Sequence, residues 1–319
     1  NWGILGTARI NRKLIEPLRT SPRNELYAVG SRSDERARSY ADEWDIPVAH
    51  GSYEELLADD AVDVVYVPLP NHLHAEWTVK ALKAGRHVLC EKPLALTPDE
   101  VDRIVNASNA ADRIVAEAFM YRHHPQTLKI RDLVDAGAIG ELRLLRSGFT
   151  FSLDRPNDIR WEPDMGGGSL WDVGCYPVSF VRFVTGMEPK VVYGTQRIGE
   201  TGVDVQFTAQ LGFAGGIVAQ IDAGFESPQR THSELVGTEG TLYVPNTFKP
   251  GPSSALQIER GTETETIQVD GEELYAGEIE DMADAVLEGE PPRISLRESW
   301  NNVNVITDLY RSAETGDPV

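Results

Sequence analysis

The first 118 residues alternate between short runs rich in β-branched residues and amphipathic stretches, and this alternation restricts the fold more than any other feature. Strands are expected over residues 2–6, 26–30, 62–67, 87–90 and 114–117. Helices are expected over residues 12–19, 34–44, 53–57, 74–84 and 98–110. Strand–helix–strand alternation is typical of a parallel sheet with helices on both faces. The predicted fold class is therefore α/β, with a doubly wound parallel sheet at the N-terminus.

After Phe119 the pattern changes to long alternating runs with few helices between them. Strands are expected over residues 142–153, 190–199, 203–213, 217–225, 231–236, 241–244 and 255–269. Helices are expected near residues 125–136, 169–185, 274–287 and 296–313. Consecutive strands predict an antiparallel sheet. The sequence thus predicts two domains: residues 1–118, and residues 119–319 as an α+β domain with a large, mainly antiparallel open sheet.

One predicted helix carries its own start signal. Thr97 precedes Pro98, and Glu100 follows three residues after the threonine. A threonine N-cap, a proline at the first helical position and a glutamate at the third are typical of a capping box. Gly85 likewise marks the end of the helix expected over residues 74–84.

The net charge is −20, from 50 acidic and 30 basic residues. Such a balance repels nucleic-acid phosphates and anionic membranes, so we expect neither as a partner. No apolar stretch reaches the ~18 residues of a membrane span, and the first residues lack the character of a signal peptide. Cys90 and Cys175 fit no disulfide or zinc pattern, which favours two buried thiols in a cytoplasmic protein. The acidic, lysine-poor composition favours a halophilic source; a solvated acidic surface is the alternative.

The turn after the first predicted strand is the first candidate site. Between this strand and the first helix stand Gly6, Thr7, Ala8, Arg9 and Ile10. In a dinucleotide-binding fold, small residues here let backbone N–H groups approach a pyrophosphate at the helix N-terminus. Gly6, Ala8 and Asn11 occupy the three glycine slots of that motif, and only the first is glycine. A plain strand–helix turn therefore remains the alternative.

The second predicted strand ends in Ser31 and Arg32. NAD-specific sites usually place an acidic residue here to bind the ribose 2′-hydroxyl. A guanidinium instead pairs with a 2′-phosphate and stacks on adenine. This position favours NADP over NAD as the cofactor; an exposed arginine at a helix start is the alternative.

Two further strand ends carry polar residues. Strand 62–67 is followed by Pro70, Asn71, His72 and His74, and strand 87–90 is followed by Glu91, Lys92 and Pro93. Ligands bind at the carboxyl ends of strands in such sheets. The histidines have no carboxylate or cysteine at metal-ligand spacing, so no metal site is predicted. Lys92, between a glutamate and a proline, is a candidate catalytic lysine, or else a surface lysine in a turn.

A glycine-rich segment, residues 166–177, contains Asp172 and Tyr176. Four residues apart on a helix, their side chains share one face. A phenol and a carboxylate together can manage the proton of a substrate hydroxyl. A glycine loop leading into an ordinary packed helix is the alternative.

In order along the chain, four segments resemble the glucose–fructose oxidoreductase and inositol dehydrogenase (GFO/IDH/MocA) superfamily. They are residues 6–10, 91–93, 117–126 and 166–177. The resemblance covers essentially the whole chain and points to NADP-dependent D-xylose dehydrogenases and dimeric dihydrodiol dehydrogenases as the nearest subgroup. It implies an N-terminal Rossmann domain, a C-terminal α/β domain, and a homodimer or homotetramer formed through the open sheet. Asn11 departs from the family's small apolar residue, which questions close helix–strand packing.

The resemblance also implies roles for individual residues. Lys92 is the essential lysine, Tyr176 the proton-transferring tyrosine and Asp172 the associated carboxylate. The Lys92–Pro93 bond is a candidate cis peptide. The cofactor's nicotinamide end and the substrate would be held by Pro70, Asn71, His74, Glu91, Arg122, Arg160 and Trp161.

The expected substrate is a sugar or related polyol, with oxidation of D-xylose at C1 as the first prediction. Tyr176 would take the hydroxyl proton while a hydride leaves C1, which gives a lactone. Oxidation of trans-dihydrodiols and reduction of anhydro- or keto-sugars would use the same lysine and tyrosine, and the pocket loops decide between them. A non-catalytic NADP-binding regulator is the alternative of another class. Such relatives tend to lose the lysine or the tyrosine, and this chain has both.

Overall fold

The computed structural model describes residues 1–319, which fall into two compact units. The first unit contains residues 1–120 and 275–300, and the second contains residues 121–274 and 301–319. The sequence predicts consecutive domains over 1–118 and 119–319, and the structure differs because segment 275–300 packs with the first unit. Ile279 and Met282 of this segment are fully buried in the first unit's core.

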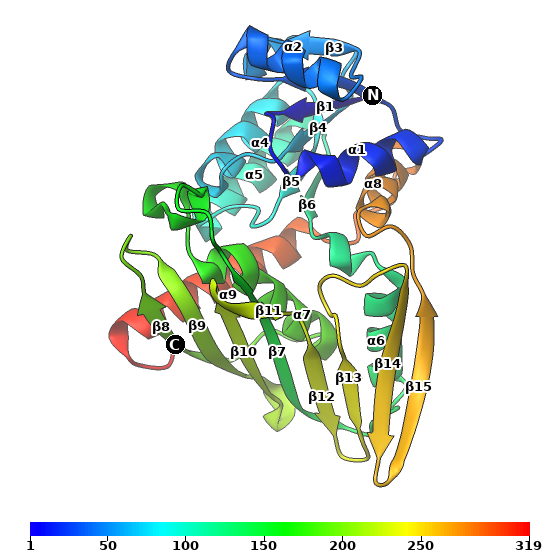
Figure 1. Ribbon diagram of the computed structural model, residues 1–319, viewed down its shortest axis with the longest axis vertical. Helices are drawn as coiled ribbons and strands as arrows, with labels where there is room; N and C mark the ends of the chain where they lie inside the picture. Colours follow the sequence, from blue (N-terminus) through cyan, green and yellow to red (C-terminus); the bar gives the residue numbers. More distant parts are fainter. The chain divides into compact units, whose positions relative to one another are not determined.

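The first unit contains a six-stranded parallel sheet in the order β3-β2-β1-β4-β5-β6 (Figure 1). Its strands are β1 (Trp2–Leu5), β2 (Leu26–Gly30), β3 (Val48–His50), β4 (Val64–Val67), β5 (His87–Glu91) and β6 (Val115–Ala118). Its helices are α1 (Asn11–Thr20), α2 (Asp34–Glu43), α3 (Tyr53–Ala58), α4 (His74–Lys83), α5 (Pro98–Ala111) and α8 (Ala276–Ala283). The doubly wound fold class is confirmed, and only β3 among these elements was not predicted.

The core of this unit explains the apolar runs in its sequence. Ile4 and Val29 in the strands pack with Leu14 and Leu18 of α1, and all four are fully buried. The strand order reverses between β1 and β4. In such a sheet this reversal opens a crevice at the carboxyl ends of the strands, where ligands bind. The loops after β1, β2, β4 and β5 are therefore the ones to inspect for a site.

The second unit contains a nine-stranded sheet in the order β15-β14-β13-β12-β7-β10-β9-β8, with β11 paired to β7. Its strands are β7 (Leu142–Ser152), β8 (Val191–Ile198), β9 (Asp204–Gly212), β10 (Val218–Gly224), β11 (Glu226–Arg230), β12 (Ser233–Gly237), β13 (Thr241–Val244), β14 (Ser253–Arg260) and β15 (Glu263–Asp270). Its helices are α6 (Pro125–Asp135), α7 (Cys175–Thr185) and most of α9 (Leu296–Thr315), which lie on one face of the sheet (Figure 1).

This sheet is mainly antiparallel, as predicted, with differences in detail. β7 and β10 pair in parallel, because α7, β8 and β9 separate them along the chain and allow a crossover. The single run expected over residues 255–269 is the hairpin β14–β15, which turns at Gly261 with a φ of +60°. β11 was not predicted. The helix expected over residues 169–185 begins with a π-helical segment, Leu170–Gly174.

One face of the second sheet is covered by helices and the other is open. Along β9, Val205 and Phe207 are buried, whereas Gln206 and Thr208 between them are exposed. This period of two is typical of an antiparallel sheet with one solvated face. No helix in the structure combines the length and the apolar character needed to cross a lipid bilayer.

Candidate functional site

The turn after β1 has the geometry of a phosphate cradle. Gly6 has a φ of +96°, and its N–H donates to the Gly30 carbonyl at 2.7 Å. A Cβ on Gly6 would lie 3.3 Å from side-chain atoms of Leu69 and Tyr53. The backbone N–H groups of the next three residues form no hydrogen bond within the chain and precede the N-terminus of α1; these residues are Thr7, Ala8 and Arg9. Free N–H groups at a helix start fit a dinucleotide pyrophosphate.

Asn11, the unusual residue in this turn, closes it. Its Nδ2 donates to the Gly6 carbonyl at 2.9 Å, and the side chain is fully buried at the start of α1. Asn11 is thus accommodated at the start of α1 by a hydrogen bond and by burial. In the usual motif, a third glycine at this position allows the helix to pack closely on the strand. Here the Asn11 amide connects α1 to the turn through its hydrogen bond to Gly6.

The end of β2 places Arg32 close to the same turn. Ser31 is buried and its N–H donates to the His50 carbonyl at 3.1 Å, whereas Arg32 is exposed. The positive charge of Arg32 lies near the hydroxyl of Tyr53. Burial raises the pKa of Tyr53, and Arg32 opposes this rise. Because Tyr53 also lies against Gly6, one phenol links the turn after β1 to the arginine after β2.

A hollow of about 450 Å³ lies beside these residues, between α1 and α2. Its lining is polar and consists of Thr7, Arg12, Ser33, Glu35, Arg36, Ser39, Tyr40 and Glu43. Arginines on both helices make part of the wall cationic. The hollow therefore offers space and positive charge next to the turn after β1.

The loop after β4 is fastened by His74. The ring nitrogens of His74 lie 2.7 Å from the Pro93 carbonyl and 2.6 Å from the Leu69 carbonyl. Burial lowers the pKa of His74 to about 4, against the opposing effect of the two carbonyls. The neutral ring has one N–H to share between two acceptors. Pro70 and Asn71 lie in the loop that His74 holds, partly exposed.

Lys92 directly follows β5, and carboxylates accept hydrogen bonds from the backbone around it. Tyr66 Oη donates to Glu91 Oε1 at 2.6 Å, and the Lys92 N–H donates to Glu91 Oε2 at 3.3 Å. Beyond the lysine, the Leu94 N–H donates to Glu117 Oε1 at 2.9 Å. The Lys92–Pro93 peptide bond is cis, as predicted. The lysine's backbone is thus tied on both sides.

In the second unit the predicted carboxylate is paired with a predicted arginine. Arg160 Nε donates to Asp172 Oδ2 at 2.6 Å, and Arg160 Nη1 donates to Asp158 Oδ1 at 3.0 Å. Asp172 is 8% exposed. Its negative charge, with that of Asp158, raises the pKa of Arg160. Asp172 lies in the π-helical segment, a helix irregularity that is frequent at functional sites.

Tyr176 lies one turn further along, among aromatic rings. It is 6% exposed, and its ring centroid lies 5.2 Å from that of Phe149, 5.5 Å from Phe248 and 5.7 Å from Tyr121. An apolar wall of this kind fixes the ring. The phenol is therefore held in one orientation by packing.

The remaining predicted residues of this unit have clear partners. Arg122 is buried, with Nη1 donating to Ser179 Oγ at 3.4 Å and its guanidinium 4.1 Å from the Phe183 ring. Trp161 Nε1 donates to the Arg155 carbonyl at 2.8 Å. The predicted residues therefore form two groups, one in each unit: Asn71, His74, Glu91 and Lys92 in the first, and Arg122, Arg160, Trp161, Asp172 and Tyr176 in the second.

Sequence reasoning missed three buried or half-buried carboxylates beside the predicted residues. Glu117 is 1% exposed and Asp204 is 3% exposed. Asp158 holds the Arg160 side chain, and its Oδ1 also accepts from the Arg160 N–H at 3.1 Å. Glu117 and Asp204 each lie among apolar residues in a predicted strand. An acidic residue in such a run was the sequence feature that could have indicated them.

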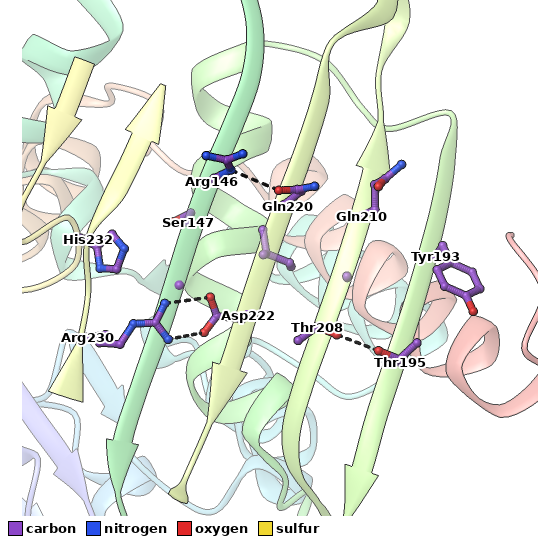
Figure 2. Close-up of a pocket in the computed structure, with 13 residues that line it drawn as sticks. Arg146, Ser147, Tyr193, Thr195, Thr208, Gln210, Gln220, Asp222, Arg230 and His232 are labelled. Atoms are coloured by element: carbon purple, nitrogen blue, oxygen red, sulfur yellow. Dashed lines mark hydrogen bonds and ion pairs between the residues drawn. The ribbon is translucent and has the colours of Figure 1, made fainter. Parts of the chain in front are cut away.

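A second hollow lies on the open face of the nine-stranded sheet and contains none of the predicted residues (Figure 2). It has a volume of about 440 Å³ over β7, β8, β9 and β10. Arg230 pairs with Asp222 at 2.9 Å, and Arg146 reaches Gln220 at 3.3 Å. The hollow is open to solvent, unlike the enclosed pocket of a small-molecule site.

The cysteines and histidines form no further site. Cys90 and Cys175 are free and buried, and burial raises the pKa of the Cys90 thiol. No group of three or more histidine, cysteine, aspartate or glutamate side chains is arranged to hold a metal ion.

Comparison with known proteins identifies both parts of the chain. Residues 1–119 match the model of an oxidoreductase family with an NAD-binding Rossmann fold, and residues 127–243 match the GFO/IDH/MocA C-terminal domain. The chain is 40% identical to D-xylose 1-dehydrogenase (NADP(+)) 2 of Haloferax volcanii, over 100% of this chain and 98% of the relative. It is 32% identical to trans-1,2-dihydrobenzene-1,2-diol dehydrogenase of Xenopus laevis, over 93% of each chain.

A solved structure agrees over nearly the same length. A 3-ketoreductase from Actinomadura kijaniata, crystallised with NADP and TDP-benzene, matches with a TM-score of 0.93 and 33% identity. The match covers 98% of this chain and 97% of the ketoreductase. The resemblance in the sequence is thereby confirmed. The chain belongs to the GFO/IDH/MocA family of oxidoreductases, with an N-terminal nicotinamide-dinucleotide-binding Rossmann fold.

Proposed function

We propose that this chain is an NADP-dependent sugar dehydrogenase that oxidises D-xylose at C1. The observation that carries the proposal is the 40% identity, over the whole chain, to an NADP-dependent D-xylose 1-dehydrogenase. The geometry of the two groups of residues described above supports it. The cofactor and substrate roles below follow from the family resemblance and from the contacts in each unit.

Arg32 is the proposed selector of NADP over NAD. Its exposed guanidinium follows β2 and lies near the Tyr53 hydroxyl, which lies beside the turn at Gly6. A guanidinium at this position can form two charged hydrogen bonds to a 2′-phosphate. It forms no ion pair with the 2′-hydroxyl of NAD. The pyrophosphate is assigned to the N–H groups of residues 7–10.

Lys92, Asp172 and Tyr176 are the proposed catalytic residues. Tyr176, acting as a phenolate, would accept the proton of the C1 hydroxyl, the positive charge of Lys92 would stabilise that phenolate, and Asp172, oriented by Arg160, would hold the sugar hydroxyls. NADP, when bound, supplies the acceptor for the hydride from C1. Loss of one hydride and one proton converts the cyclic aldose to its lactone. Pro70, Asn71, His74, Glu91, Arg122 and Trp161 are assigned to shaping or contacting the cofactor's nicotinamide end.

Two other substrates fit the same residues. Relatives include a dihydrodiol dehydrogenase and several reductases of dTDP-linked keto-sugars, at 32–37% identity. All these reactions move a hydride to or from a carbon that bears oxygen. Specificity then depends on pocket loops more than on the lysine and tyrosine.

A homodimer or homotetramer through the open sheet face is proposed as the assembly. The face over β7 to β10 is broad and carries both signs of charge at Arg146, Arg230 and Asp222 (Figure 2). Both signs on one patch allow a two-fold-related copy to bind it in a self-complementary way. Light scattering at several protein concentrations would test this, and a monomer throughout would refute it.

A spectrophotometric assay tests the activity. Reduced nicotinamide is followed at low and high salt with NADP or NAD, D-xylose, other aldoses and trans-dihydrodiols, and in reverse with keto-sugars. We expect NADP reduction to be fastest with D-xylose or a close pentose. Turnover only with a diol or a keto-sugar would replace the proposed substrate. NADP binding without turnover in either direction would favour a regulatory protein.

A further inference from the structure

Asp204 is a buried carboxylate outside the proposed mechanism. It stands at the first position of β9 and is 3% exposed. It accepts hydrogen bonds from Tyr310 Oη at 2.6 Å, Ser169 Oγ at 2.7 Å and the Leu170 N–H at 2.8 Å. Burial raises the pKa of Asp204, and the three donors oppose that rise. A buried carboxylate is tolerated only when hydrogen bonds compensate its lost hydration, so all three donors matter.

The glycine run is shaped around this carboxylate. Gly168 has a φ of +114°, and a Cβ on it would lie 2.2 Å from Asp204 Oδ1. A Cβ on Gly167 would lie 2.6 Å from the Arg160 carbonyl. The N–H groups of Gly167 and Gly168 donate to the carbonyls of Glu162 and Arg160, both at 3.0 Å. No side chain fits at either position, because the Arg160 carbonyl and the Asp204 carboxylate lie too close. The two glycines therefore connect the loop that contains Arg160 to Asp204.

The same contacts fix the start of the segment that carries the proposed catalytic pair. The Leu170 N–H is the first of this π-helical segment, and the Asp172 N–H donates to the Gly168 carbonyl at 3.1 Å. Tyr310 of α9 also packs against Trp171, with ring centroids 5.7 Å apart. One carboxylate thus connects a strand, a C-terminal helix and the residues just before Asp172.

We propose that Asp204, together with Tyr310, is a positioning residue for Asp172 and Tyr176. It caps their helix from a remote strand and thereby sets where both side chains lie relative to the sheet. This inference rests on the proposed function for the roles of Asp172 and Tyr176. Loss of the cap removes no reacting group but lets the helix start shift, and a shift of about 1 Å in a catalytic group can cost ~100-fold in rate.

Tyr310→Phe and Asp204→Asn test this proposal. The first removes one hydroxyl and keeps the ring, and the second keeps the shape but turns an amide N–H₂ towards donors. Ser312→Ala is the matched control. Ser312 is fully buried two residues along the same helix, and its hydroxyl bonds to the Gly194 N–H at 3.1 Å and the Asp317 carbonyl at 2.7 Å, away from Asp204.

Hydrogen exchange of a peptide covering residues 168–177 is measured with kcat, the KM for sugar and the Kd for NADP. We expect faster exchange there and ~10–100-fold lower kcat in both test variants, with the NADP Kd unchanged. Ser312→Ala should show neither effect. Exchange and kcat in Tyr310→Phe and Asp204→Asn equal to those of the control would overturn the proposal. If the wild type oxidises no sugar, the proposed function fails, while the exchange comparison still decides whether Asp204 holds this segment.

Discussion

Three helices of the first unit begin differently from the segment that carries the proposed catalytic pair in the second unit. In the first unit, Ser33, Ser52 and Thr97 cap α2, α3 and α5, each accepting from an N–H three residues ahead at 3.0 to 3.3 Å. In the second unit, the segment with the proposed catalytic pair is capped by Asp204, which lies 34 residues beyond Leu170. A local cap fixes where a helix starts along its own chain. A remote cap also fixes where that start lies relative to another element.

The difference follows from where each unit carries its candidate catalytic residues. Lys92 directly follows β5, which is paired on both sides by β4 and β6, so the sheet itself sets the backbone position. Asp172 and Tyr176 lie on a helix that crosses a sheet. Side-chain packing holds the ring of Tyr176, and the hydrogen bonds to Asp204 add a directional tie between the start of this helix and a strand. Single substitutions can therefore separate four effects: loss of a reacting group, loss of cofactor selectivity, loss of positioning and loss of folding stability.

The largest effects are expected at the reacting groups of both units. Lys92→Ala and Tyr176→Phe should each lower kcat by ~10²–10⁴, the usual contribution of general acid–base catalysis. NADP binding, followed by nicotinamide fluorescence, should change little. Lys83→Ala, exposed on α4, and Tyr243→Phe, partly exposed on β13, are controls in the same units and should keep wild-type rates. Full activity in both site variants would remove the proposed mechanism.

A smaller effect is expected where the first unit binds cofactor. Arg32→Ala should weaken NADP binding ~10–100-fold, because a hydrogen bond to a charged group contributes about 1.5–3 kcal/mol. NAD binding should stay within about two-fold, since NAD lacks the 2′-phosphate. Arg38→Ala, on α2 and paired with Asp34 at 2.9 Å, is the control. Equal losses for NAD and NADP by titration would show that Arg32 does not read the phosphate.

The sequence predicts the first unit more completely than the second for a physical reason. Gly6, Arg32 and Lys92 each follow a strand, and strand ends are visible as local changes in pattern. The contacts of Asp204 with Ser169 and Tyr310 join residues 35 and 106 apart in sequence. No periodicity reports such contacts, and the same holds for the parallel pairing of β7 with β10. Asp172 and Tyr176 were found by their motif, whereas the residues that fasten them were not.

In the first unit, His74 is a buried side chain that contacts the backbone of a distant segment at Pro93. Folding lowers the pKa of His74 from 6.5 to about 4, so the folded state binds fewer protons than the unfolded state between these values. Stability is therefore complete above pH 6.5 and falls as the pH drops towards 4, by about 2 kcal/mol at pH 4.5. His74→Gln removes this titration. Thermal midpoints of both proteins from pH 7.5 to 4.5 measure it.

The difference between the two pH profiles isolates His74 from the other histidines. The wild type should lose more stability than His74→Gln between pH 6.5 and pH 4.5. It should be the more stable protein at neutral pH, where the neutral ring donates its one N–H to the carbonyl of Leu69 or Pro93. Parallel profiles would mean that His74 titrates alike in both states, and then burial would not govern its charge.

The smallest effect is expected at a local cap. Thr97→Ala removes the acceptor for the Glu100 N–H and should cost about 1 kcal/mol, or roughly 2–4 °C in Tm. Glu100 also accepts from the Leu96 N–H at 3.0 Å, which keeps part of the capping box. Thr20→Ala at the end of α1, whose hydroxyl only bonds back to its own helix, is the control. Loss of a local cap lets the first turn fray but does not move the helix, so kcat should be unchanged. A loss of kcat as large as that expected of Tyr310→Phe would mean that local and remote caps both position catalytic residues.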